Sequence, residues 1–152
     1  MILKEKELMT IQDLQTQEKS CIEKYQRYSK EAKDPVLQNL FTTLSQKERT
    51  HYDSLKQVID GACPKCDAND SDGRNYQPSA TYQRDENSED KKKDCFLATD
   101  CIGTEKMVSD SYNSNVFVFG NSDIRKLLAD IQVEEQNHAE MLWKYKTVNG
   151  MS

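Results

Sequence analysis

A helical stripe pattern occurs twice along this chain, and it constrains the fold more than any other feature. In residues 4–60 and again in residues 91–147, seam residues recur at alternating steps of four and three, the spacing that keeps side chains on one packed face of a helix. Seven seam residues of the first copy have a counterpart 87 positions later, as Phe41 has in Leu128. The repeat predicts two similar helical halves.

Turn signals divide each copy into two helices. Asp34 is suited to cap a helix whose first position is Pro35, and Gly61 is suited to end that helix. In the second copy, either Asn121 or Ser122 caps the last helix. Helices joined by so short a turn are antiparallel neighbours, so each copy is predicted to form a helical hairpin.

Between the hairpins, residues 61–90 lose the pattern and become rich in Gly, Pro, Asn, Asp and Ser, which predicts a long crossover loop. The charged fraction of 31% and the hydrophobic fraction of 36% suit amphipathic helices with solvated outer faces. We therefore predict a single all-α domain over residues 1–152, a four-helix bundle made of two helical hairpins joined by a long crossover. One stretch before the last helix, SYNSNVFVFG, has poor helix propensity and can be misread as a strand.

Six polar residues interrupt the inward-facing rows of this pattern. Glu48 and His51 take consecutive seam positions between Leu44 and Leu55, where a bundle core normally takes aliphatic side chains. Burying an uncompensated carboxylate costs on the order of several kcal/mol, so four at one level do not suit a metal-free core unless some are protonated. Two divalent cations would balance four carboxylates, and two imidazoles can bind as neutral ligands. The six candidate ligands are Glu18, Glu48, His51, Glu105, Glu135 and His138.

This ligand set is the one found in di-iron and di-manganese carboxylate bundles, with one Glu from each of two helices and a Glu-x-x-His from each of the other two. Carboxylate-rich ligation without thiolates favours iron or manganese and does not choose between them, and zinc can substitute in a purified sample. In the predicted arrangement, Glu48 and Glu135 bridge the two metal ions, Glu18 and His51 complete one ion, and Glu105 and His138 complete the other.

Ordinary roles are expected for the neighbours of these residues. A single Glu-x-x-His on a helix is most often a surface pair, and a vestigial site with protonated carboxylates is a further alternative. Glu31, Glu134 and Glu140 are interpreted as solvated outer-face charges. Tyr25 and Tyr112 lie one heptad from the lone glutamates, and aromatic core filling is predicted for them ahead of hydrogen bonding near the site or electron transfer.

Cys63 and Cys66 form a Cys-x-x-Cys turn, which can bind a metal with a second thiol pair or cycle as a dithiol. Cys95 and Cys101 are six positions apart and Cys101 belongs to a helix seam, which argues against a four-thiolate site. We interpret Cys63 and Cys66 as exposed loop thiols without a metal, able to form crosslinks in an oxidising assembly. Cys21 and Cys101 are interpreted as small apolar fillers.

The overall charge argues against one class of partner. The net charge is −5 and Lys and Arg gather on no single face, so nucleic acid is not expected to bind. The first residues, MILKEKELMT, lack the apolar core of a signal peptide, and no apolar run is long enough for a transmembrane segment. We expect cytoplasmic synthesis with reduced cysteines.

Three stretches carry a resemblance to known proteins: KEKELMTIQDLQTQEKSCIEKY, AKDPVLQNLFTTLSQKERTHYDSL and IQVEEQNHAEMLWKY. With them the chain resembles the ferritin-like superfamily, whose members include bacterioferritins, rubrerythrins and manganese catalases. Within that superfamily it looks most like the ferritin-like spore coat proteins related to the coat F family. The resemblance implies a dimetal site at the six candidate ligands and assembly into the spore coat. Other coat proteins are then the expected partners, and a homodimer is a further expectation.

Two functions of different classes remain open at this point. The first is a ferritin-like dimetal-binding protein of the spore coat, in which two iron or manganese ions stabilise the helices. The second is an oxidoreductase of the rubrerythrin or manganese-catalase type, which acts on peroxide or dioxygen at the dimetal site. Paired Cys-x-x-Cys knuckles of a rubredoxin-like domain are absent from the chain, which argues against a rubrerythrin with its own electron-transfer module.

Overall fold

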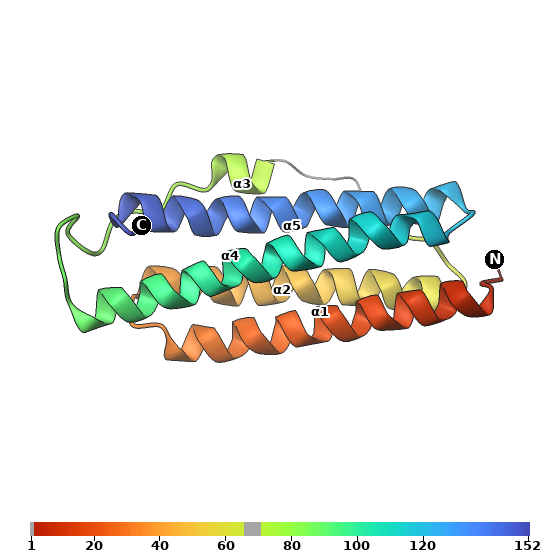
Figure 1. Ribbon diagram of the computed structural model, residues 1–152, viewed down its shortest axis with the longest axis horizontal. Coiled ribbons are helices and arrows are strands. Elements are labelled where there is room, and N and C mark those ends of the chain that lie inside the picture. Colours follow the sequence, from red (N-terminus) through yellow and green to blue (C-terminus); the bar gives the residue numbers. More distant parts are fainter. Residues whose placement is uncertain (1, 66–70) are drawn as a thin grey trace.

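The structure is a computed structural model that describes residues 2–65 and 71–152, and this part of the chain is all-helical (Figure 1). It contains no strand, so the predicted all-α class is confirmed. The helices are α1 (Glu5–Glu31), α2 (Pro35–Ile59), the short α3 (Ser71–Asn75), α4 (Glu89–Asn115), the 3-10 helix η1 (Val116–Val118) and α5 (Ser122–Val148).

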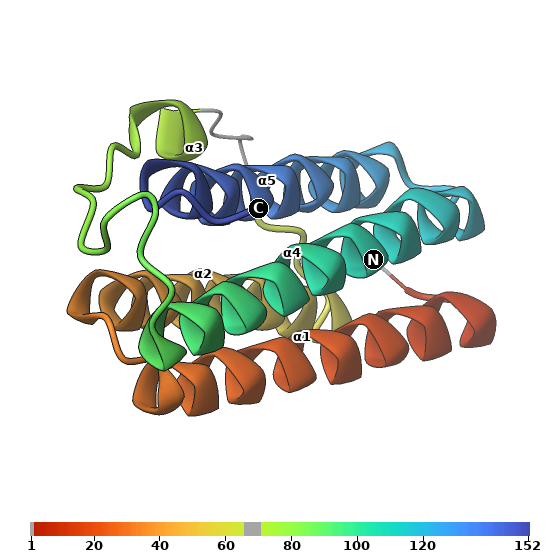
Figure 2. The same ribbon diagram turned by 60° about the vertical axis from the view of Figure 1, so that its left-hand side comes forward.

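The four long helices lie side by side, and α3 lies against the outer side of α5 (Figures 1 and 2). Helix α1 packs most extensively on α2, and α4 packs most extensively on α5. The segment between α2 and α4 thus carries a short helix of its own, where the sequence predicts only a loop. None of the described helices is both long and apolar enough to cross a membrane.

The helix ends follow from local hydrogen bonds. The side chain of Asp34 accepts a hydrogen bond from the backbone N–H of Val36 at 3.0 Å, and Pro35 occupies the first helical position of α2. Asn121 rather than Ser122 caps α5, because its Oδ1 accepts from two backbone N–H groups at the helix start. Gly61 follows α2 with a φ of 97°, a left-handed conformation that glycine adopts without steric cost.

The stretch SYNSNVFVFG is helical through Asn115 and continues as η1, so it is not a strand. Tertiary packing explains why its poor helix propensity does not decide the outcome. Tyr112 is 1% exposed within α4, and Phe119, which follows η1, is 3% exposed. Burying these two aromatic rings outweighs the small propensity differences among the residues around them.

A buried carboxylate of α4 connects the turn between α1 and α2 to the crossover. Asp94 of α4 is fully buried and accepts hydrogen bonds from the backbone N–H groups of Lys33 and Asp34, at 2.8 and 2.9 Å. It also accepts the hydroxyl of Tyr82 at 2.6 Å. Asp34 in turn accepts the hydroxyl of Tyr145, at 2.7 Å. This network connects α4, the α1–α2 turn, the crossover and α5.

The apolar interior forms two clusters, one toward each end of the long helices. One cluster includes Ile11 and Leu128, and the other includes Phe41 and Leu142. On α2, α4 and α5 the predicted ligands fall between the residues of the two clusters, as Glu105 does on α4, whereas Glu18 of α1 lies between Leu14 and Cys21 of the first cluster. A polar layer therefore crosses the middle of an otherwise apolar interior.

Candidate metal centre

The six residues predicted as metal ligands come together in this polar layer. They form two overlapping groups, and within each group one ligand atom from every residue lies within 4.8 Å of the others. Every member is buried, and the two glutamates of the Glu-x-x-His pairs belong to both groups. This sharing is what two bridging carboxylates require. The groups are Glu18, Glu48, His51 and Glu135, and Glu48, Glu105, Glu135 and His138.

Each histidine of the layer faces a carboxylate of the other hairpin. The Nδ1 atom of His51 lies 2.7 Å from Oε1 of Glu135, and Nδ1 of His138 lies 2.7 Å from Oε1 of Glu48. The two imidazole rings stack, with centroids 5.7 Å apart and an interplanar angle of 16°. The lone glutamates are slightly farther away, with Nδ1 of His51 at 3.7 Å from Glu18 and Nδ1 of His138 at 3.5 Å from Glu105. The two halves of the layer are thus closely similar.

The 2.7 Å contacts between the histidines and the glutamates do not count as hydrogen bonds, because the atoms involved still lack a hydrogen-bond partner. Within the described residues, eight buried side-chain nitrogen and oxygen atoms lack a hydrogen-bond partner, and all eight belong to the six predicted ligands. They include the Nδ1 atoms of both histidines and both carboxylate oxygens of Glu48 and Glu135. Buried polar atoms in proteins are nearly always paired, so eight unpaired atoms at one level set this layer apart from the rest of the described interior.

Burial and mutual repulsion perturb the titration of these groups in the metal-free protein. Burial raises the pKa of Glu18 well above its usual value, and the charge of Glu48 raises it further. Burial also raises the pKa of Glu135, as does the charge of Glu105. Burial opposes ionisation of Glu48 too, but contact with the Glu18 carboxyl and the charge of His138 hold the pKa of Glu48 well below its usual value. Burial and repulsion therefore favour the protonated form of Glu18 and Glu135, whereas the contacts of Glu48 favour its carboxylate form.

The prediction for Glu134 is wrong. From the sequence, Glu134 is interpreted as a solvated outer-face charge, but in the structure it contacts His51. Its Oε2 lies 2.6 Å from Nε2 of His51, on the side of the ring opposite the carboxylates of the layer, and its side chain is only 26% exposed. A carboxylate on the second nitrogen of a histidine fixes the ring orientation and raises the basicity of the first nitrogen. The only feature of the sequence that points to a role of Glu134 near the site is that it directly precedes Glu135 on α5.

The position of the first hairpin that corresponds to Glu134 carries a residue of opposite charge. The counterpart of Glu134, 87 positions earlier, is Lys47, which forms an ion pair with Asp72 of α3 at 3.0 Å. The outer-face interpretation agrees with the structure for Glu31, which pairs with Arg27 at 2.9 Å on α1. It agrees also for Glu140, which pairs with a lysine one turn later on α5.

Tyr25 and Tyr112 do more than fill the core. Both are buried, and their hydroxyls donate hydrogen bonds across the hairpins, from Tyr25 to Glu105 and from Tyr112 to Glu18. Burial and the adjacent glutamate raise the pKa of each tyrosine well above its usual value, so each remains a hydrogen-bond donor. Core filling alone is therefore an incomplete interpretation, because both tyrosines also orient predicted ligands.

The four cysteines within the described residues contribute no ligand atom to these groups. Cys21 and Cys101 are buried as predicted, and burial raises the pKa of each thiol. Cys63 is half-buried and free, and burial raises its pKa as well. Cys66 lies outside the described residues, so the prediction for the Cys-x-x-Cys turn stays a prediction.

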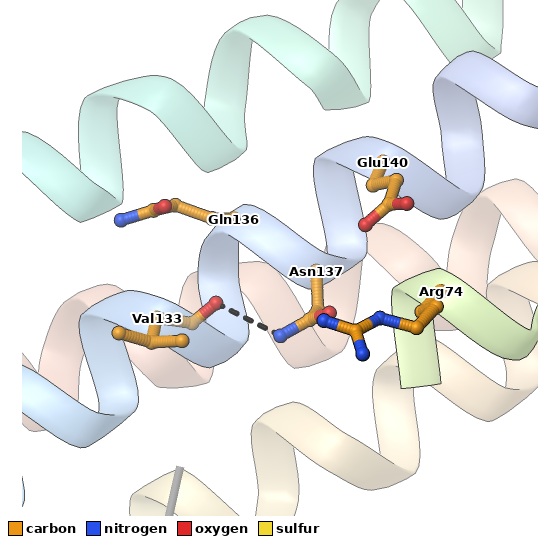
Figure 3. A pocket seen from close by; sticks show the side chains of 5 residues that line it. All are labelled: Arg74, Val133, Gln136, Asn137 and Glu140. Carbon is orange, nitrogen blue, oxygen red and sulfur yellow. Dashed lines mark hydrogen bonds between the residues drawn. The ribbon is translucent and has the colours of Figure 1, made fainter. Parts of the chain in front are cut away.

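Two cavities lie along α5 at the level of the candidate ligands. One, of about 390 Å³, lies where α3 meets α5 and is lined by none of the six residues; Figure 3 shows Asn137 facing Arg74 there. The other, of about 260 Å³, lies between α4 and α5, and Glu105 and Glu135 are among the residues that line it. We call this second space the α4–α5 cavity.

The fold and the layer define an all-helical protein with a buried cluster of carboxylates and imidazoles. The family model of the Coat F domain matches residues 93–152, which include Glu105, Glu135 and His138. Comparisons with curated proteins and with solved structures found no match.

Proposed function

We propose that this chain is a ferritin-like protein that binds two divalent metal ions, iron or manganese, and that it is a component of the spore coat. The coat assignment is supported by the Coat F domain match over residues 93–152. The ferritin-like assignment is supported by four long helices that pack as two pairs with the ligand candidates at one level. Detection of the chain in the coat fraction of purified spores tests the first assignment.

The observation that carries the metal proposal is the set of eight unpaired atoms. Each belongs to a buried glutamate or histidine, and none to any other residue of the described chain. Four carboxylates at one level bring up to four negative charges, which two divalent cations balance. Oxygen and imidazole donors without thiolate suit iron and manganese, and zinc is a plausible substitute. The residues present therefore fit two ions.

The residues around the site have roles that follow from their contacts. Tyr25 and Tyr112 hold the carboxylates of Glu105 and Glu18 in place through their hydroxyl groups. Glu134 holds the ring of His51 so that its Nδ1 faces the layer. Two bound iron or manganese ions would supply Lewis acidity and access to a second oxidation state.

A second candidate function is oxidation–reduction of peroxide or dioxygen at the same site. The α4–α5 cavity favours it, because a small molecule there would lie beside Glu105 and Glu135. Peroxide consumption by protein carrying two iron or two manganese ions tests this candidate. Inactivity of both fully loaded forms would rule it out and leave the metal-binding proposal intact.

Replacing Glu48 and Glu135 together by Gln is expected to abolish stoichiometric metal binding. Both residues belong to both ligand groups, so the change removes an anionic donor from each ion, and we expect a loss of affinity of at least about 100-fold. Metal analysis of protein equilibrated with Mn²⁺ or Fe²⁺ measures the effect. The matched control is Glu31→Gln, an outer-face glutamate of α1. Two ions per chain in the double variant would contradict the ligand assignment.

Replacing Glu134 by Ala is expected to weaken one of the two ions selectively. His51 loses the carboxylate at its Nε2 atom, whereas His138 is not affected, so one binding step should weaken by about 10- to 100-fold. Titration calorimetry with Mn²⁺ would then show two unequal steps. Glu140→Ala on the same helix is the control and should titrate like the unmodified chain. Equal weakening of both steps would argue against a specific role of Glu134.

A further inference from the structure

The α4–α5 cavity has an exposed mouth and a buried inner wall. Its inner wall includes Glu105 and Glu135, which are 1% and 0% exposed. Lys106, Asp110 and Gln136 also line it and are exposed, so they form its outer part. The charges of Lys106 and Asp110 are opposite, which leaves the mouth without a strong preference for cations or anions.

Small or apolar side chains line the section of the cavity between its mouth and its inner wall. Ile102, Ser109 and Ala139 line the cavity and are partly buried. Beyond them, one oxygen of Glu105 and both oxygens of Glu135 are buried without a hydrogen-bond partner. The cavity volume of about 260 Å³ holds several water-sized molecules, since one water takes up roughly 30 Å³ in the liquid. A molecule in this space would thus lie beside Glu105 and Glu135, whose unpaired oxygens are buried behind the cavity wall.

The corresponding face of the other hairpin carries larger side chains. Eighty-seven positions before Ser109 stands Ile22, which is 2% exposed, and 87 positions before Ala139 stands Tyr52. The guanidinium of Arg49 lies over the Tyr52 ring, 5.6 Å from its centroid. An isoleucine and a tyrosine are larger than the serine and the alanine that stand at the corresponding positions of the α4–α5 side. The two faces of the layer therefore differ in side-chain size although their ligands correspond.

We propose that the α4–α5 cavity is the site at which a small exogenous ligand of two or three heavy atoms, the size of peroxide or azide, reaches the dimetal centre. This inference rests on the proposed metal binding and adds the direction of access. The ligand enters between α4 and α5 and meets the ion held by Glu105 and His138. On the α1–α2 side, beside Glu18 and His51, the larger Ile22 and Tyr52 stand at the corresponding positions. The Ser109 hydroxyl and the Gln136 amide supply hydrogen-bonding groups along the way.

The test uses the full chain loaded with Co²⁺, whose visible absorption reports a change of ligand, and azide as the probe. Ala139→Tyr places at position 139 the side chain that stands at position 52 and fills the cavity. We expect two Co²⁺ ions per chain as before and an azide affinity at least about tenfold lower. The matched control is Ala129→Tyr, the same change at an exposed position of α5, for which the azide affinity should stay unchanged.

Ser109→Ile is a second and milder variant of the same cavity, which serves if Ala139→Tyr lowers the helix content in circular dichroism. It should weaken azide binding in the same direction. Unchanged azide affinity in the folded variants, with two Co²⁺ ions bound, would overturn the access proposal and leave the metal site intact. Failure of azide to perturb the spectrum of the Co²⁺-loaded unmodified chain would also overturn the access proposal and leave the metal site intact. Failure of the unmodified chain to bind Co²⁺ would overturn both proposals.

Discussion

Loading the protein with two Mn²⁺ ions is expected to raise its melting temperature by about 15 °C or more. An ion that binds only the folded state stabilises it by about 4 kcal/mol when its free concentration is a thousandfold above its Kd, and two sites contribute together. For a chain of this size, each kcal/mol shifts the melting temperature by about 2–4 °C. The physical source is the removal of unpaired buried charge at the eight ligand atoms. Thermal unfolding followed by circular dichroism, with chelator and with Mn²⁺, measures the shift.

The Glu48→Gln/Glu135→Gln variant is the control for this effect. It should melt at the same temperature with chelator and with Mn²⁺, because it no longer binds the ions. In its metal-free form, loss of the Glu135 carboxylate removes repulsion, whereas loss of the Glu48 carboxylate removes its favourable contacts with Glu18 and His138, so we expect a stability close to that of the metal-free unmodified chain. If the unmodified chain bound two ions and melted at one temperature in both conditions, the ions would have no part in its stability.

Replacing Asp94 by Ala is expected to lower the free energy of unfolding by about 3–5 kcal/mol. The change leaves the buried backbone N–H of Asp34, the partly buried N–H of Lys33 and the Tyr82 hydroxyl without their acceptor. Each unpaired donor costs about 1–3 kcal/mol, and a carboxylate makes stronger hydrogen bonds than a neutral group. Urea unfolding of the metal-free chain measures the loss.

The control for this prediction is Asp110→Ala on the same helix. Asp110 is exposed, so its replacement should change the stability by no more than about 0.5 kcal/mol. Asp94→Asn keeps one acceptor oxygen and should fall between the two. A loss at position 94 no larger than the loss at position 110 would show that the network does not hold the crossover in place.

Positions within a single helix could be predicted because helical periodicity is a local property. The seam register assigned Glu48 and His51 to the interior of α2, and both are buried there. The same register separated Glu135 from Glu134, since neighbouring residues of a helix differ by about 100° in direction. It did not show that Glu134 would face His51, because that contact joins α5 to α2 and depends on how the two hairpins dock.

The tyrosines illustrate the same limit. Their burial follows from the stripe pattern, but each hydroxyl reaches a glutamate that belongs to the other hairpin, as Tyr112 reaches Glu18. Asp94 gave no signal at all, because its partners are backbone N–H groups about 60 positions earlier in the chain. Pattern analysis detects which residues turn inward and not which polar atoms meet there.

Sequence periodicity and the 87-residue repeat were sufficient for the all-helical class and for a set of six inward-facing polar residues, because both depend on spacing along individual helices. The pairing of each histidine with a carboxylate of the other hairpin required the docked helices. So did the cavity between α4 and α5 beside Glu105 and Glu135, because its lining residues are brought together only by packing. Spacing is encoded locally, whereas contacts between hairpins form only when the chain folds back on itself.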